Sequence, residues 1–161
     1  MTNREFYLAR MKADAPGFVK VIRAIPPAAA GYRPHPKSRS ASELAWMFVA
    51  SANCALDLID KRRVEWAEPK PGQTLAAAAD ELDKAQKRLM ARVAELDGKA
   101  WARKATLLMG GKVGWSAPLG EMLWGFLFDA IHHRGQLSTY IRPTGGKVPS
   151  IYGPSGDDPG A

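Results

Sequence analysis

A chain of 161 residues that is 46% hydrophobic can bury a core without a disulfide or structural metal, so we expect one domain over residues 1–161. Its single cysteine excludes an internal disulfide, and no apolar run could span a bilayer or act as a signal peptide, so we expect a cytoplasmic protein without a membrane partner. The net charge of +7 favours acidic partners in general. Because the basic residues are scattered and form no recognition module, we expect a solvated basic surface first, an anionic small-molecule partner next, and no nucleic-acid partner.

The first part of the chain predicts two helices. Apolar residues recur at mostly helical spacing over 4–25, although a proline and a glycine at 16–17 interrupt them, so this segment is either one kinked helix or two short ones. Ser40 or Ser42 can cap the N-terminus of the second helix, which runs to about residue 63. Its apolar face contains Leu44, Met47, Phe48, Ser51, Cys54, Ala55, Leu58 and Ile59.

A third helix is predicted over about 74–97, where apolar residues alternate three and four steps apart as in the seam of a bundle. Residues 99–116 indicate a short strand-like or irregular connection across one end of that bundle. Gly110 and Gly111 are explained there as backbone turns. Because no alternation of period two lasts long enough, we expect no sheet.

The last helix is predicted over 116–141, with Ser116 as its N-cap and Pro118 in its first turn. The remaining residues, about 143–161, are rich in Pro, Gly and Ser, which favours an irregular, extended tail packed over the bundle. Four main helices with apolar stripes and modest connections predict an all-α fold, a four-helix bundle.

The last helix also carries a candidate metal site. Asp129 and His133 are four residues apart, so both side chains project from one face of the helix and suit a single Zn, Ni, Mn or Fe ion. A catalytic site usually needs a third protein ligand. The alternative is structural: Asp129 accepts a hydrogen bond from His133 or Arg134 and no metal binds. His132 points roughly 100° away from His133 and suits a surface or supporting role.

Two stretches resemble a known family. One is FDAIHHRGQLSTYIRPTGGKVPSIYGPSGDD, which starts at Phe128, and the other is SELAWMFVASANCALDLI in the second helix. Both are similar to the DinB-like superfamily (DinB/YfiT-like proteins), and HHRGQLSTYIR followed by GGKVPSIYGPS is the most specific part. The resemblance covers the chain from about Arg39 onward, with the first helix also in place. It implies a four-helix bundle of the DinB-like type.

The resemblance further implies a divalent-metal site of three histidines, one on the second helix and two at i, i+4 on the last. His133 matches the second of the helical pair, Asp129 replaces the first, and Met47 stands at the position on the second helix. Aspartate can still ligate Zn, Ni or Mn, whereas a thioether is a weak ligand for these ions and methionine commonly fills bundle cores. Glu43 and Ser51, one turn before and after Met47, could offer oxygen instead.

Two functions stay open. The first is a metal-dependent thiol transferase or related enzyme that acts with a low-molecular-weight thiol. Its metal, Zn, Ni or Mn, would be held by Asp129, His133 and a third group, with His132 or Gln136 in the shell around them. The second is a non-catalytic member whose degenerate site holds no metal and binds a small ligand, or which serves a structural or stress-response role. The resemblance implies a homodimer in either case.

Overall fold

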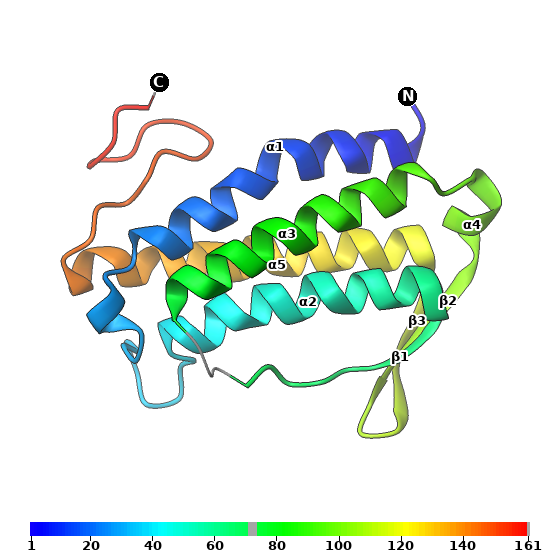
Figure 1. Cartoon of the computed structure of the whole chain (residues 1–161), viewed down its shortest axis with the longest axis horizontal. Helices are drawn as coiled ribbons and strands as arrows, with labels where there is room; N and C mark the ends of the chain where they lie inside the picture. Colours follow the sequence, from blue (N-terminus) through cyan, green and yellow to red (C-terminus); the bar gives the residue numbers. More distant parts are fainter. Residues whose placement is uncertain (71–73, 161) are drawn as a thin grey trace.

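In residues 1–70 and 74–160, the part of the chain that the computed structural model describes, four long helices lie side by side (Figure 1). They are α1 (Asn3–Ala24), α2 (Ala41–Lys61), α3 (Leu75–Ala94) and α5 (Leu119–Ile141). Helices α1 and α2 each pack against both α3 and α5. This arrangement confirms the predicted all-α four-helix bundle, and α1 is one continuous helix that includes Pro16.

The helix starts follow from local capping. The Ser40 hydroxyl accepts a hydrogen bond from the Glu43 amide, and the Glu43 carboxylate accepts one from the Ser40 amide at 2.6 Å, so Ser40 is the N-cap of α2. Thr2 and Glu5 form the same reciprocal pair at the start of α1. Thr74 caps α3 with its hydroxyl. Each cap satisfies amide hydrogens that have no partner within the first helical turn.

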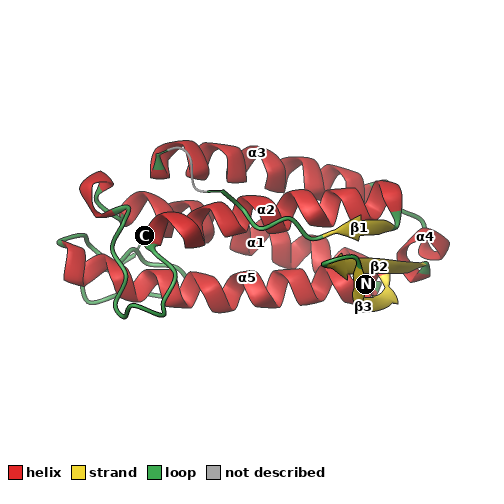
Figure 2. Ribbon diagram, turned by 90° about the horizontal axis from the view of Figure 1, so that it is seen from below, coloured by secondary structure: helices red, strands yellow, loops and turns green. Residues whose placement is uncertain are grey.

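A small sheet at one end of the bundle was not expected from the sequence. It joins β1 (Arg63–Glu65), β2 (Lys104–Met109) and β3 (Lys112–Pro118), beside the short helix α4 (Gly98–Ala102) (Figure 2). Strand β1 runs parallel to β2, and β2 runs antiparallel to β3. Gly110 and Gly111 form the hairpin turn with positive φ angles of 61° and 76°, which glycine adopts readily, so the two turn predictions are confirmed.

The predicted start of the last helix is wrong by three residues. Ser116 and Pro118 belong to β3, and α5 begins at Leu119 without a side-chain cap. The Ser116 hydroxyl instead lies 2.9 Å from the Thr106 hydroxyl on the neighbouring strand. A serine that satisfies its hydroxyl across a strand pair is not available to cap a helix.

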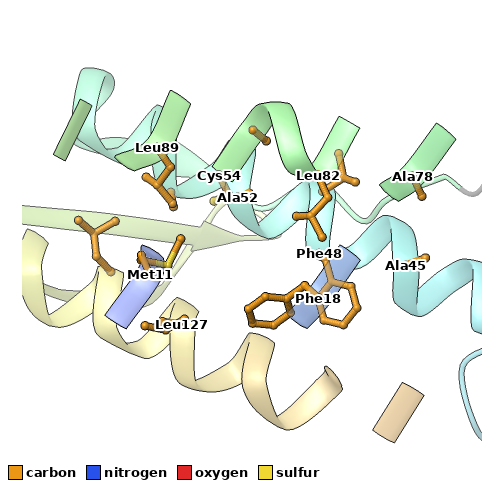
Figure 3. Close-up of a cluster of buried hydrophobic side chains, with 14 of the residues drawn as sticks. Met11, Phe18, Ala45, Phe48, Ala52, Cys54, Ala78, Leu82, Leu89 and Leu127 are labelled. Atoms are coloured by element: carbon orange, nitrogen blue, oxygen red, sulfur yellow. The ribbon is translucent and has the colours of Figure 1, made fainter. Parts of the chain in front are cut away.

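The interior is formed by side chains from all four long helices, which point toward one another (Figure 3). Phe18 and Phe48 meet edge to face, with their ring centroids 5.5 Å apart. An apolar cavity of about 40 Å³ lies among these side chains, large enough to hold a water molecule. None of the helices in the described residues is long and apolar enough to cross a membrane.

Beyond α5 a short helical turn, Arg142–Thr144, leads into an irregular C-terminal segment. Asp157 accepts hydrogen bonds from the Val148 amide and the Arg142 guanidinium, both at 2.9 Å. Such bonds lower the pKa of Asp157, that from the Val148 amide most. The segment lies at the end of the bundle opposite the sheet (Figures 1 and 2). Of the tail expected over 143–161, only residue 161 lies outside the described residues.

Candidate functional site

The pair of residues singled out in the last helix lies at the surface of α5. His133 Nε2 is 3.5 Å from Asp129 Oδ1, as expected for side chains one helical turn apart. The imidazole is half-buried, with 19% of its side chain exposed, whereas the carboxylate is 56% exposed. One helix therefore supplies two groups that could contact the same ion or the same ligand.

Gln136 connects the two neighbouring imidazoles. Its Oε1 lies 2.7 Å from His133 Nδ1, and its Nε2 lies 3.0 Å from His132 Nε2. Because an amide oxygen can only accept, His133 Nδ1 must donate, which leaves the Nε2 lone pair of the neutral ring free beside Asp129. A histidine that binds a metal is usually oriented in this way by an acceptor for its other ring nitrogen. The structure thus brings His132 and Gln136 next to His133, where the sequence had assigned them supporting roles.

The third family position supplies no imidazole or carboxylate to this group. Met47 is buried on α2, with 6% of its surface exposed, and it does not line the hollow into which His133 opens. Within residues 1–70 and 74–160, no three His, Cys, Asp or Glu side chains lie close enough together to hold a metal ion. The donors present therefore fit two positions of a divalent-metal site and not the three that hold such an ion firmly.

The two oxygen donors considered near Met47 are engaged elsewhere. The Glu43 carboxylate belongs to the cap of α2 and lies 3.3 Å from Arg33 Nη2. The hydrogen bond from the Ser40 amide is the main reason that the pKa of Glu43 is lowered. Ser51 is buried and lines the apolar core cavity. Neither residue supplies a ligand beside His133.

Of the two neighbours that the structural alternative named for Asp129, His133 lies beside it at 3.5 Å and Arg134 does not. Arg134 turns toward α1, where its Nη1 lies 3.5 Å from Asp14 Oδ1. Its Nη2 donates a hydrogen bond to the hydroxyl of Tyr152 in the C-terminal segment. Five residues along an α-helix correspond to about 140° of rotation, so Arg134 and Asp129 face different sides of α5.

A hollow of about 760 Å³ opens between the second half of α5 and the connection that precedes α2. Its walls include Lys37, Ser38 and Arg39 on one side and His132, His133 and Gln136 on the other. The two sides belong to the same end of the bundle (Figure 1). Unlike the small apolar cavity in the core, this hollow contains the imidazoles, and it is therefore the candidate site.

Tyr140 joins the two sides of this hollow, and the sequence analysis did not identify it. Its hydroxyl donates a hydrogen bond to the Arg39 carbonyl at 3.0 Å, and its ring packs edge to face on Tyr32. Burial is the main cause of its raised pKa, so the hydroxyl keeps its proton as a donor. The available signal was helical spacing, since positions 133, 136 and 140 follow one face of α5.

The chain's own thiol is not part of the site. Cys54 is buried between helices of the core, as Figure 3 shows. Burial, with a smaller contribution from Asp57, raises the pKa of this thiol to about 11. A thiol that stays protonated near neutral pH is a poor nucleophile, so any thiol chemistry at His133 would need a thiol from the ligand.

Comparisons with known proteins agree with the architecture. A family model described as the DinB family matches residues 1–159. The chain is also similar to a solved structure of a DinB-like protein, YjoA, from Bacillus subtilis. That match has a TM-score of 0.70 and 17% sequence identity, and it covers 88% of this chain and 93% of the other. At 17% identity the match supports the fold alone. A search of curated proteins found no match.

Proposed function

Since the chain belongs to the DinB family, we propose that it binds a small ligand in the hollow beside His133, at a family metal site that lacks its third ligand. The observation that carries this proposal is Met47, a buried thioether that does not line the hollow, at the position where the resemblance places a histidine. The hollow nevertheless keeps polar groups that a ligand could contact. The described polar groups of the hollow are sufficient to bind a ligand without a firmly held metal.

The chemistry available at the hollow is hydrogen bonding and proton exchange. His133 Nε2 can accept a hydrogen bond or a proton from a ligand hydroxyl or thiol, because Gln136 already takes the proton on Nδ1. A proton accepted at Nε2 would lie beside the opposite charge of Asp129. Because His132 also contacts Gln136, a ligand that moves the Gln136 amide would change the environment of the His132 ring as well.

Histidine ring signals in nuclear magnetic resonance spectra test this proposal directly. The protein is first treated with a chelator to remove metal. Binding of a low-molecular-weight thiol or another small ligand should then shift the signals of His132 and His133. Shifts that appear only after a divalent metal is added would contradict a binding role without metal.

A second candidate is a metal-dependent transferase or related enzyme that acts with a low-molecular-weight thiol. One observation favours it: the free lone pair of His133 Nε2 and the Asp129 carboxylate lie 3.5 Å apart, close enough to share an ion. Zinc, nickel or manganese at one equivalent in protein purified without a nickel column, and its loss in Asp129→Ala, would support this candidate.

The homodimer implied by the resemblance is also a proposal for this chain, with a second copy as the partner. Phe6 on α1 and Phe128 on α5 are exposed, and both rings lie against Trp124, at centroid distances of 5.6 and 5.4 Å. Exposed apolar side chains that cluster in this way mark association surfaces. Light scattering should therefore give twice the 17.5 kDa mass of the chain.

The double variant Phe6→Ser, Phe128→Ser should shift that mass toward one chain. Val113→Ser, an exposed apolar residue on the hairpin, is the matched control and should leave the mass unchanged. A parent protein that is monomeric at high concentration would rule out the homodimer.

A further inference from the structure

We propose that the ligand of this hollow carries an oxyanion, a carboxylate or a phosphate group, which Lys37 and Arg39 hold at one end while His132 and His133 meet the rest of the molecule. This inference rests on the proposed binding role and adds the charge of the ligand. Among the described residues that line the hollow, two are cationic and none is an aspartate or a glutamate. Opposite charge would therefore attract an anion into the hollow and disfavour a cation.

Arg39 already shows how it would bind an oxyanion. Its Nη1 and Nη2 lie 3.3 and 3.2 Å from the two oxygens of Glu68, a paired contact that the planar guanidinium makes with carboxylates and phosphates alike. Both side chains of this pair are exposed, and exposed pairs contribute little stability. A ligand oxyanion can consequently take the place of Glu68.

The backbone that carries the two cations is fixed to the opposite wall. The hydrogen bond from the Tyr140 hydroxyl to the Arg39 carbonyl ties the connection before α2 to α5. The Lys37 amide donates to His35 Nδ1 at 3.1 Å, which stabilises the turn that holds Lys37. An anion held by Lys37 and Arg39 would thus be kept at a defined position relative to the imidazoles on α5.

The acidic groups around the hollow do not cancel this charge. Glu43 lies behind Arg39 in the cap of α2 and is paired with Arg33. Asp129 does not line the hollow, although it lies 3.5 Å from His133 Nε2. Glu68 is the one acidic side chain that contacts a cation of the hollow in the described part of the chain, so it is the natural competitor of a ligand anion.

Titration of the whole chain with succinate and with inorganic phosphate, followed by the ring signals of His132 and His133, tests the inference. Succinamide is the neutral analogue of the carboxylate arm. We expect both anions to bind, and Arg39→Gln and Lys37→Gln each to weaken binding about tenfold, as for loss of one charge-assisted hydrogen bond. Glu68→Gln should strengthen binding a few-fold because it removes the competitor. Lys112→Gln, in the hairpin at the other end of the bundle, should change nothing.

The outcomes separate this inference from the proposal on which it rests. Preference for succinate alone or phosphate alone identifies the oxyanion and supports the inference. Equal affinity for succinamide and succinate, or an unchanged affinity in Lys37→Gln and Arg39→Gln, would overturn the charge assignment and leave the binding role standing. If neither anions nor neutral compounds shift the two imidazoles, both fail. Because Glu68→Gln is expected to act in the opposite direction, loss of folding cannot imitate the full pattern.

Discussion

Replacing Arg134 by alanine should lower the free energy of unfolding by about 3 kcal/mol, the low end of the range for breaking a buried ion pair. Arg134 and Asp14 are among the most buried charged residues of the chain, with side chains 4% and 1% exposed. Removing the guanidinium leaves the Asp14 carboxylate inside the protein. It keeps a contact with Arg10 at 2.9 Å, which is why we place the cost at the low end.

The same guanidinium connects three parts of the fold. It stacks over the rings of Phe18 and Tyr152, 4.7 and 4.8 Å from their centroids. The Tyr152 hydroxyl accepts from Arg134 and donates to Asp14 at 2.6 Å, so the C-terminal segment is tied to α1 and α5 together. Gly17 makes room for this arrangement, because a Cβ there would lie 3.0 Å from Arg134 Nη1.

Urea unfolding of Arg134→Ala, compared with the parent, measures this cost. Arg142→Ala is the matched control, since Arg142 also pairs with a carboxylate, Asp157, but at the surface. That exposed pair should contribute no more than about 1 kcal/mol. Equal losses in the two variants would mean that the buried network of Arg134 does not stabilise the bundle.

Introducing two histidines should change the metal content of the protein from substoichiometric to about one ion per chain. The double variant Met47→His, Asp129→His supplies the three imidazoles that the resemblance implies, and three protein ligands suffice to hold a divalent ion with an open position. Zinc, nickel or manganese added in excess should remain bound after dialysis in the double variant.

Single variants identify which position limits binding. Asp129→His alone restores the pair on α5 but keeps Met47, so we expect metal binding close to that of the parent. Because Met47 is buried, a histidine there costs stability in the absence of metal, and circular dichroism must show that the double variant is folded. Stoichiometric binding by Asp129→His would show that another group already acts as the third ligand.

The sequence predicted the helices because each long helix repeats a local apolar pattern, as in α3, which contributes Leu75, Ala78, Leu82 and Leu89 to the core. Strand β1 escaped prediction because it is short and finds its partner far along the chain, whereas β2 and β3 form a local hairpin. Strand β1 has three residues, and its Val64 pairs with Leu107. A periodic pattern within a few residues cannot reveal that two strands so far apart in the sequence pair with each other.

In the candidate site, too, the contacts within one helix could be predicted and those between distant segments could not. The contacts among His132, His133 and Gln136 lie within one turn of α5, so their spacing was enough to bring them together in a prediction. Arg39 was missed because it reaches this helix from about one hundred positions away, through the hydroxyl of Tyr140. Met47 could be placed on a core face from the sequence, but its absence from the hollow depends on how α2 packs against α5.

The most direct measurement is elemental analysis of the unmodified protein, purified without a nickel column and dialysed after exposure to excess zinc, nickel or manganese. Asp129 and His133 lack a third ligand within the described fold. We expect no stoichiometric metal in the parent and about one equivalent in Met47→His, Asp129→His prepared beside it. One equivalent retained by the parent would contradict the claim.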